Sequence, residues 1–204
     1  MLDHPFYMEL KQWQTVIGSV LGFLALTWGA LFNYHLGRKR DDRVRNIECV
    51  SIAIGIYGEV QQLSADLAKM ANGIGGWYLR SGIHGDSAPQ HFSGNWVLPD
   101  PLLYKALAPK LGMLPPGILG PVIKFYAYYN EAITHFPKIL SDEERPVSYG
   151  VGWVLDPAIR AIDEVQPALR EIEKLGEIET PVPNPDLNKA RQAKELEDEM
   201  HPDW

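Results

Sequence analysis

Hydrophobic and polar positions divide the chain into one uncharged segment near the N-terminus and several later stretches with helical spacing. No Asp, Glu, Lys or Arg occurs between Gln12 and Gly37, and residues 16–32 are almost entirely apolar or small. This run is longer than the about 10 to 14 residues typical of a buried core helix and approaches the ~20 needed to cross a bilayer. The pattern predicts a transmembrane helix over residues 13–36.

The flanks of this segment predict its orientation. Trp13 lies near its start and Tyr34 and His35 near its end, where aromatic rings favour the headgroup region. Basic residues crowd the C-terminal flank, which the positive-inside rule keeps cytoplasmic. We therefore expect residues 1–12 to be a short external tail and residues 37–179 to form a cytoplasmic helical domain. The basic flank consists of Arg38, Lys39, Arg40, Arg43 and Arg45.

A cleaved signal peptide is the main alternative for the apolar segment. It would need a basic region before the apolar run and a small-residue cleavage site after it. Lys11 is the only basic residue among the first eleven, and no A-x-A-like site follows the run. We therefore expect the helix to be retained.

Small residues recur along one face of the predicted membrane helix, where they would let a second helix approach closely. This stripe predicts a homo-oligomer formed through the membrane helix. Glycine is also frequent in membrane helices in general, so an ordinary lipid-facing helix stays open as the alternative. The helix-association candidates are Gly18, Gly22, Ala25 and Gly29.

Apolar residues at spacings of three and four predict a long helix over about residues 44–71. Residues 52–56 also alternate as a strand would, so a strand is the alternative there. Gly37 and the Asp41-Asp42 pair are where the membrane helix would end if it does not continue into this helix. Residues 72–100 are rich in Gly, Ser and Pro with interspersed aromatic residues, which predicts an ordered loop.

Three further helices are predicted from proline and glycine positions. Asp100-Pro101 is typical of the start of a short helix that reaches about Leu107, and Gly112 is typical of a stop. A second helix is expected over residues 116–136, ended by Pro137. Asp156-Pro157 predicts the start of a third, which reaches residue 175 and is kinked at Pro167.

The C-terminal residues 180–204 are expected to form a proline-containing linker and an acidic tail. Residues 180–186 contain three prolines and predict an extended linker. Residues 187–200 have few apolar side chains, which favours either an exposed helix or partial disorder.

Charge and cysteine content exclude some classes of function. The net charge of -7 argues against general nucleic-acid binding, which needs a basic surface. Cys49 is the only cysteine, so no intramolecular disulfide can form, and we interpret it as a packed apolar residue. The expected partners are the lipid bilayer, a second copy of the chain and an unknown protein.

Two stretches carry a resemblance to known proteins. Residues 102–132, with the sequence LLYKALAPKLGMLPPGILGPVIKFYAYYNEA, and residues 56–67, IYGEVQQLSADL, resemble uncharacterised bacterial membrane-anchored helical proteins with a single membrane span. The resemblance implies a location in the bacterial inner membrane. It implies no activity and no functional residues.

Candidate catalytic and metal-binding residues are few. No HExxH, CxxC, P-loop or GxSxG motif is present. Glu59 and Glu131 are interpreted as partly buried carboxylates that serve as hydrogen-bonding groups or, alternatively, as general bases. His84 and His91 are more typical of a polar loop than of a zinc site, and His135 is a further candidate. No cofactor, metal site or catalytic residue is predicted.

A group of aromatic residues is expected to belong to the core, with a ligand pocket as the alternative. The group consists of Tyr104, Phe125, Tyr126, Tyr128, Tyr129 and Trp153.

Because no catalytic or cofactor site is predicted, the leading hypothesis is a membrane-anchored interaction or scaffold protein. The alternative is a membrane-tethered sensor of small molecules or an enzyme using Glu59, Glu131 or the loop histidines.

Overall fold

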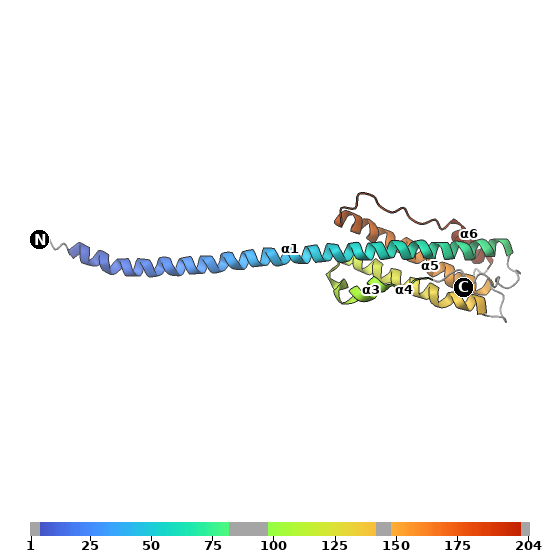
Figure 1. Ribbon diagram of the computed structural model, residues 1–204, viewed down its shortest axis with the longest axis horizontal. Coiled ribbons are helices and arrows are strands. Elements are labelled where there is room, and N and C mark those ends of the chain that lie inside the picture. The colour runs from blue at the N-terminus through green and yellow to red at the C-terminus, as the bar shows by residue number, and fades with distance from the viewer. Residues whose placement is uncertain (1–4, 82–97, 142–147, 201–204) are drawn as a thin grey trace. The chain divides into compact units, whose positions relative to one another are not determined.

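The protein is mainly helical, and the computed structural model describes residues 5–81, 98–141 and 148–200. No strand occurs among these residues, so the mainly helical prediction is confirmed and the strand alternative for residues 52–56 is wrong. The chain divides into two compact units, Met1–Glu48 and Cys49–Trp204. Helix α1 (Pro5–Ser81) contributes residues to both units (Figure 1).

The first unit consists of the N-terminal part of α1. The helix begins at Pro5, so most of the segment expected to be a tail is helical. Gly37 and the Asp41-Asp42 pair lie within the helix and do not end it. In the described part of the chain, α1 contains the one stretch long and apolar enough to cross a membrane, and the side chains of that stretch are exposed.

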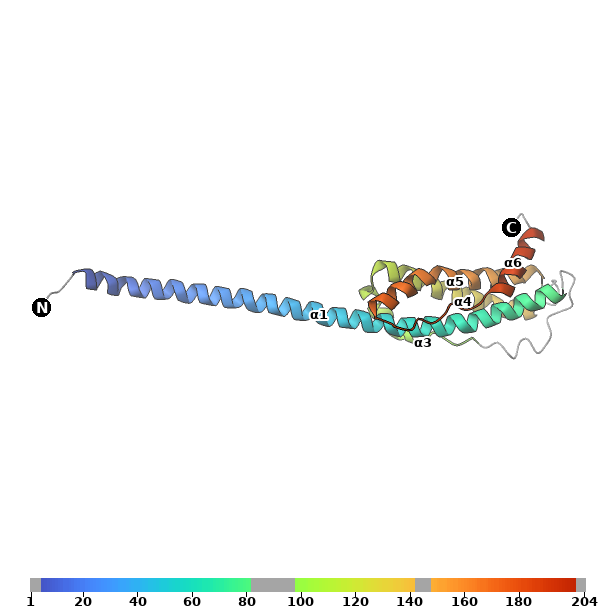
Figure 2. The same ribbon diagram turned by 90° about the horizontal axis from the view of Figure 1, so that it is seen from above.

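The second unit is a bundle of three long helical segments: residues 49–81 of α1, α4 (Pro116–Ser141) and α5 (Ser148–Leu175). Figures 1 and 2 show these segments side by side, with α5 antiparallel to the other two. Apolar side chains at helical spacing fill the space between them and supply most of the favourable free energy of folding. The largest fully buried aliphatic side chains are Ile56, Leu67, Met70, Ile74, Ile118, Leu155, Ile162, Leu169 and Ile172.

The loop predicted over residues 72–100 begins later than expected. Helix α1 continues to Ser81, because Ile74, Trp77 and Tyr78 lie on the face of the helix that points into the bundle and are buried there. Burial of these three side chains outweighs the low helix propensity of the neighbouring glycines. The remaining residues of that loop, 82–97, lie outside the described residues.

A short helix follows where it was predicted and ends at Leu107 as expected, but the predicted cap and the predicted stop are not found. Helix α3 (Leu102–Leu107) leads directly into the 3-10 helix η1 (Ala108–Met113), so Gly112 does not stop it. Asp100 does not cap α3, and its carboxylate lies 3.2 Å from the ammonium of Lys105. The N-terminus of α3 is capped instead by a side chain from α1, described below.

Two proline positions were misinterpreted as helix ends. Helix α4 passes through Pro137 to Ser141, because Phe136 and Ile139 in its last turns are buried and compensate for the missing hydrogen bond. Helix α5 begins at Ser148, before the predicted start at Asp156-Pro157, because the intervening turns also bury apolar side chains. It continues through Pro167, and the kink at this residue stays a prediction.

The end of α5 shows why a glycine occupies position 176. Glu177, rather than Gly176, has a positive φ of 50°, and the amide of Ile178 donates to the carbonyl of Glu173 at 2.9 Å. This is the Schellman arrangement with a non-glycine residue in the left-handed position. A Cβ at Gly176 would lie 3.1 Å from the side chain of Ile54, so the absent side chain permits close helix packing.

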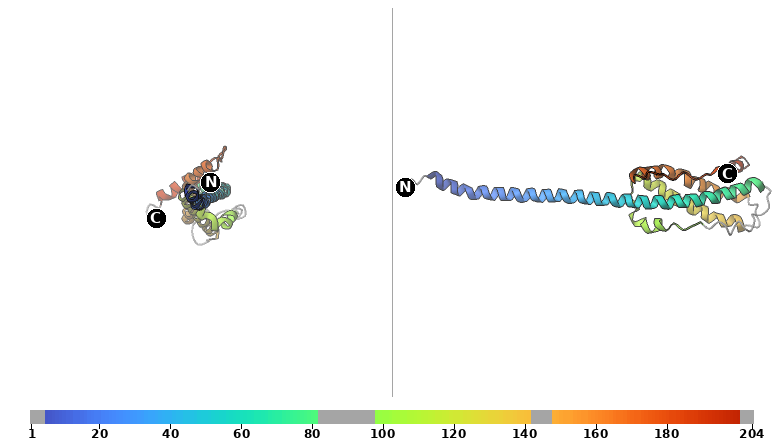
Figure 3. Two further views of the ribbon diagram at one scale, coloured as in Figure 1. Left: turned by 90° about the vertical axis from the view of Figure 1, so that its left-hand side faces the viewer. Right: turned by 45° about the horizontal axis from the view of Figure 1, so that its top comes forward.

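The C-terminal tail also needs correction, because it packs against the bundle. Residues 180–186 are non-helical as predicted, but α6 (Asn188–Met200) lies against the bundle (Figure 3). Its Ala190 and Ala193 are buried, as is Leu187 just before it. The side-chain oxygen of Asn72 on α1 accepts hydrogen bonds from the amides of Lys189 and Ala190, both at 3.1 Å. The scarcity of large apolar residues suggested that this segment could be disordered. Hydrogen bonds to the first amides of α6 and the burial of small side chains hold it in place instead.

Candidate functional site

The apolar part of α1 presents hydrophobic side chains to the outside over its whole circumference. Phe23 is 71% exposed, and Leu26 and Trp28 are each 76% exposed. A water-facing helix normally restricts such residues to one stripe, whereas a helix that is apolar all round is typical of a buried or membrane-spanning position. None of the residues in the most apolar window is buried within the protein.

The small-residue stripe on this helix has open space around it. A Cβ built on Gly18, Gly22 or Gly29 would meet no atom within 4 Å, and Ala25 is exposed. The residues predicted to support helix association are therefore available to a second helix, and their role in association stays a prediction.

Glu59 is the candidate carboxylate with the most defined surroundings. It lies on α1 and accepts hydrogen bonds from the amides of Leu103 at 2.6 Å and Tyr104 at 2.8 Å. These two amides belong to the first turn of α3, which has no partners for them within the helix, so Glu59 caps that helix from a distant part of the chain. The hydroxyl of Tyr126 on α4 donates a third hydrogen bond at 2.7 Å. One carboxylate thus joins α1, α3 and α4.

Tyr126, which donates to Glu59, is held in its protonated form. Burial raises the pKa of Tyr126 far above its usual value, and its hydrogen bond to the Glu59 carboxylate raises it further. Its ring stacks on that of Tyr104, with centroids 3.8 Å apart. Because both Glu59 oxygens already accept hydrogen bonds within the fold, the arrangement is suited to holding helices together rather than to removing a proton from a substrate.

The other sequence-predicted candidates are not brought together at Glu59. Glu131 is exposed on α4. His135 lies further along α4, and its ring centroid is 5.9 Å from that of Trp153. His84 and His91 lie outside the described residues.

The aromatic group divides between core and surface. Phe125, Tyr126 and Tyr129 are buried, and the hydroxyl of Tyr129 donates to the carbonyl of Pro99 at 2.7 Å. Tyr128 is only half-buried, and Trp153 is 48% exposed. The described rings therefore belong mostly to helix packing, as the core interpretation predicted.

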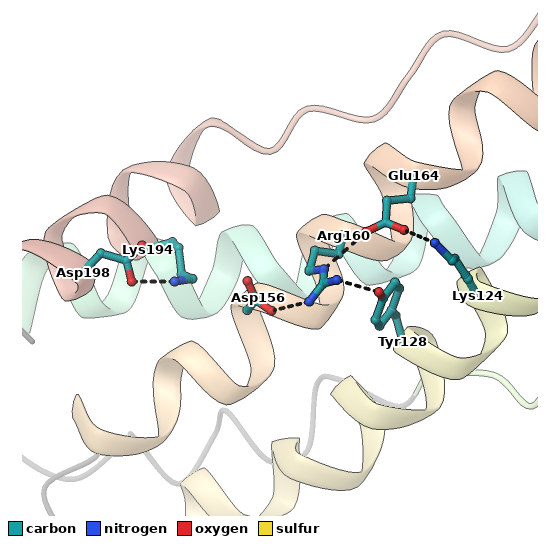
Figure 4. A network of polar contacts seen from close by, with 7 residues as sticks. All are labelled: Lys124, Tyr128, Asp156, Arg160, Glu164, Lys194 and Asp198. Carbon is teal, nitrogen blue, oxygen red and sulfur yellow. Dashed lines mark hydrogen bonds and ion pairs between the residues drawn. The ribbon is translucent and has the colours of Figure 1, made fainter. Parts of the chain in front are cut away.

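A network of charged groups covers the outer face of α4 and α5 (Figure 4). Arg160 donates to the hydroxyl of Tyr128 at 2.7 Å and to Glu164 at 3.3 Å, and it also pairs with Asp156 at 3.6 Å. Lys124 donates to the other oxygen of Glu164 at 3.4 Å. Desolvation acts to raise the pKa of Glu164, but the hydrogen bonds from Arg160 and Lys124 prevail and lower it. The network leaves each of these charges with a partner.

Metal binding finds no support in residues 5–81, 98–141 and 148–200. No group of three His, Cys, Asp or Glu side chains there is placed to hold a metal ion. Cys49 is half-buried and partly packed against the core.

No family model, curated protein or solved structure matches this chain.

Sequence reasoning missed two polar groups on α1 that connect it to the C-terminal segments. Asn72 caps α6, and the hydroxyl of Tyr57 donates to Glu173 at 2.9 Å and accepts from the amide of Val182 at 3.2 Å. Neither has a local sequence signal, because its partners lie more than 100 residues away along the chain.

Proposed function

We propose that the protein is a single-pass membrane protein of the bacterial inner membrane whose cytoplasmic helical bundle serves as an interaction or scaffold module. The observation that carries the proposal is the exposed apolar surface of α1 in the first unit. Large apolar side chains cover every side of residues 16–36 and are not packed against the rest of the protein. Moving one such side chain out of water is favourable by about 1.5–3 kcal/mol.

The length of this surface fits a bilayer. At a rise of about 1.5 Å per residue, a helix over residues 16–36 extends about 30 Å, which matches the hydrocarbon core. The backbone there is helical throughout, so its polar groups are satisfied without water. The basic flank that follows favours a cytoplasmic position for the second unit.

The described part of the second unit supports an interaction role through its surface. Glu59 is used to connect helices, and four charged side chains of α4 and α5 are paired with one another: Lys124, Asp156, Arg160 and Glu164. What the unit offers outwards is a charged helical face and a few exposed apolar side chains, among them Leu102 and Trp153. Such surfaces suit protein partners, in which aromatic and charged groups contribute to recognition.

Anchoring can be tested by extracting bacterial membranes with alkaline carbonate. The full chain should stay in the membrane pellet. A variant carrying Leu21→Arg and Leu24→Arg should be released or fail to insert, because each charge costs about 2.5–3.5 kcal/mol at the centre of a span. Leu102→Arg, an exposed position in the second unit, is the matched control and should stay in the pellet. Complete release of the unmodified chain would rule out the anchor.

Orientation and partner require separate measurements. A reporter active only in the cytoplasm, fused after Trp204, should be active, whereas activity of a periplasmic reporter there would reverse the proposed orientation. Affinity purification of the full chain in mild detergent, followed by cross-linking and mass spectrometry, should recover a partner linked to the second unit. Recovery of an N-terminally shortened chain would identify the apolar segment as a cleaved leader.

A further inference from the structure

The basic flank of α1 places five positive charges within residues 38–45. All five of its side chains are exposed, and none forms an ion pair with any described residue. In the second unit, by contrast, Arg160 pairs with Asp156 and Glu164, and Arg191 pairs with Asp163 at 2.7 Å. The flank therefore concentrates positive charge that the described chain does not neutralise.

The positions of these charges around the helix separate them into two faces. With about 100° per residue, Lys39, Arg43 and Arg40 fall within an arc of about 100°. Asp41 and Asp42 lie outside this arc, on the side that carries Arg38 and Arg45. One face of the helix is thus purely basic, and the opposite face mixes both signs.

The basic face is unfavourable without an anion. Lys39 and Arg43 are four residues apart, and Arg40 and Arg43 are three apart, so these like charges are neighbours on the helix surface. Such pairs destabilise an isolated helix, yet this segment is fully helical. A group with negative charge that contacts all three side chains would remove the repulsion.

The basic segment is long enough to pass through a headgroup layer. Residues 38–45 rise about 10 Å along the helix axis, compared with about 5–8 Å for the polar layer on each side of a bilayer. Their charges surround the helix, whereas a helix that lies flat on a membrane has an apolar face opposite its basic one. This distribution fits a helix that passes through the headgroup layer.

We propose that Lys39, Arg40 and Arg43 form a binding face for the phosphate of an anionic phospholipid, here called the basic face. The inference rests on the proposed membrane anchoring. The ligand is a lipid with a net negative headgroup, such as phosphatidylglycerol, because the arginine guanidinium groups donate to phosphate oxygens in paired hydrogen bonds. A zwitterionic headgroup also offers a phosphate, but its ammonium group would be repelled by the same three cations.

The test uses the full chain reconstituted in vesicles of phosphatidylcholine and phosphatidylglycerol at three to one. The protein is dissolved again in mild nonionic detergent and captured, and the lipids that remain bound are measured by mass spectrometry. For the unmodified protein, the bound ratio of phosphatidylglycerol to phosphatidylcholine should exceed that of the vesicle by about fivefold. Added inorganic phosphate should not displace the lipid if the headgroup is held at the membrane surface.

Two variants that lose the same amount of charge distinguish binding at the basic face from general electrostatic attraction between the protein and anionic lipid. Arg40→Gln with Arg43→Gln should abolish most of the enrichment, whereas Arg38→Gln with Arg45→Gln should retain it. Arg40→Lys with Arg43→Lys should keep at least part of it. Equal loss in both glutamine variants, or displacement by phosphate, would overturn the lipid-binding face.

The outcomes also distinguish this inference from the anchor. If the protein resists carbonate extraction from the vesicles but shows no enrichment, the binding face is wrong and the anchor stands. If the protein does not stay in the mixed vesicles, both proposals fail. All four substituted positions are exposed, so circular dichroism of each variant should match that of the unmodified protein.

Discussion

The hydroxyl of Tyr126 donates a hydrogen bond of 2.7 Å to Oε2 of Glu59, which joins α4 to α1 at the point where α3 begins. The same carboxylate accepts from two amides of α3, so a single side chain satisfies donors from two other helices. Its removal would leave a buried hydroxyl without its acceptor and a helix without its cap.

Glu59→Ala should therefore lower the free energy of unfolding by about 2–4 kcal/mol, from the loss of a cap and of a buried hydrogen bond. Glu59→Gln keeps an acceptor oxygen and should cost less. Glu131→Ala removes an exposed carboxylate and should change stability by at most about 0.5 kcal/mol. Thermal unfolding of the detergent-solubilised full chain, followed by circular dichroism, gives the comparison, and equal effects of the two alanine variants would show that Glu59 does not connect the helices.

Alkaline pH should destabilise the bundle through its buried tyrosines. Burial raises the pKa of both Tyr126 and Tyr129, so the folded protein keeps protons that the unfolded chain releases near pH 10. Their stabilising contribution is complete below pH 10 and is lost as the pH rises above it, by about 1.4 kcal/mol per pH unit for each group. Urea unfolding between pH 8 and 11 measures the slope above pH 10. Tyr129→Phe should reduce that slope, whereas Tyr34→Phe, an exposed ring in the first unit, is the control.

Gly75 and Gly58 should respond in opposite ways to alanine. A Cβ at Gly75 would lie 2.5 Å from the carbonyl oxygen of Lys189, a backbone atom that cannot move aside without shifting α6. Gly75→Ala should therefore destabilise the protein by about 1–3 kcal/mol. Gly58 lies in the same helix with no atom within 4 Å of its added Cβ, so Gly58→Ala should stabilise it by about 0.5–1 kcal/mol. The same melting experiment measures both, and stabilisation by Gly75→Ala would contradict the close crossing of α1 and α6.

Removal of the C-terminal tail should weaken the bundle. Truncation after Glu179 removes the buried Leu187, Ala190 and Ala193 and leaves Asn72 without its partners, which should cost about 2–4 kcal/mol. Ala193→Asp should reproduce part of the loss, because it places a charge at a buried position, whereas Gln192→Asp on the exposed side should not. An unchanged melting temperature after truncation would show that α6 contributes nothing to stability.

Association through the membrane helix should depend on Gly22. Close packing of small residues supplies much of the attraction between helices in lipid, so Gly22→Ile should weaken association and Leu21→Ile should not. A membrane two-hybrid assay with the isolated segment compares the three sequences. If all three give the same signal, the stripe at Gly18, Gly22, Ala25 and Gly29 is ordinary lipid-facing surface.

The local sequence pattern was sufficient to predict the helices whose apolar residues follow one another along the chain at regular spacing. The uncharged run after Gln12 predicts a membrane-compatible helix, and the apolar spacing around Val60 and Val122 predicts helices that the structure contains. These predictions succeed because helical periodicity and segment length depend on neighbouring residues alone. They fail at Pro137 and Asp156, where the local rule indicates an end or a start and packing against other helices extends the element.

Tertiary structure decided what each polar residue does. The sequence alone singles out Glu59 as a carboxylate beside an apolar face, but only the fold shows that its partners come from α3 and α4. It likewise shows that Asn72 caps a tail more than 100 residues away, which turns a segment with few apolar residues into a packed helix. A hydrogen bond between distant segments leaves no periodic signal in either segment, because its geometry exists only after the helices have packed.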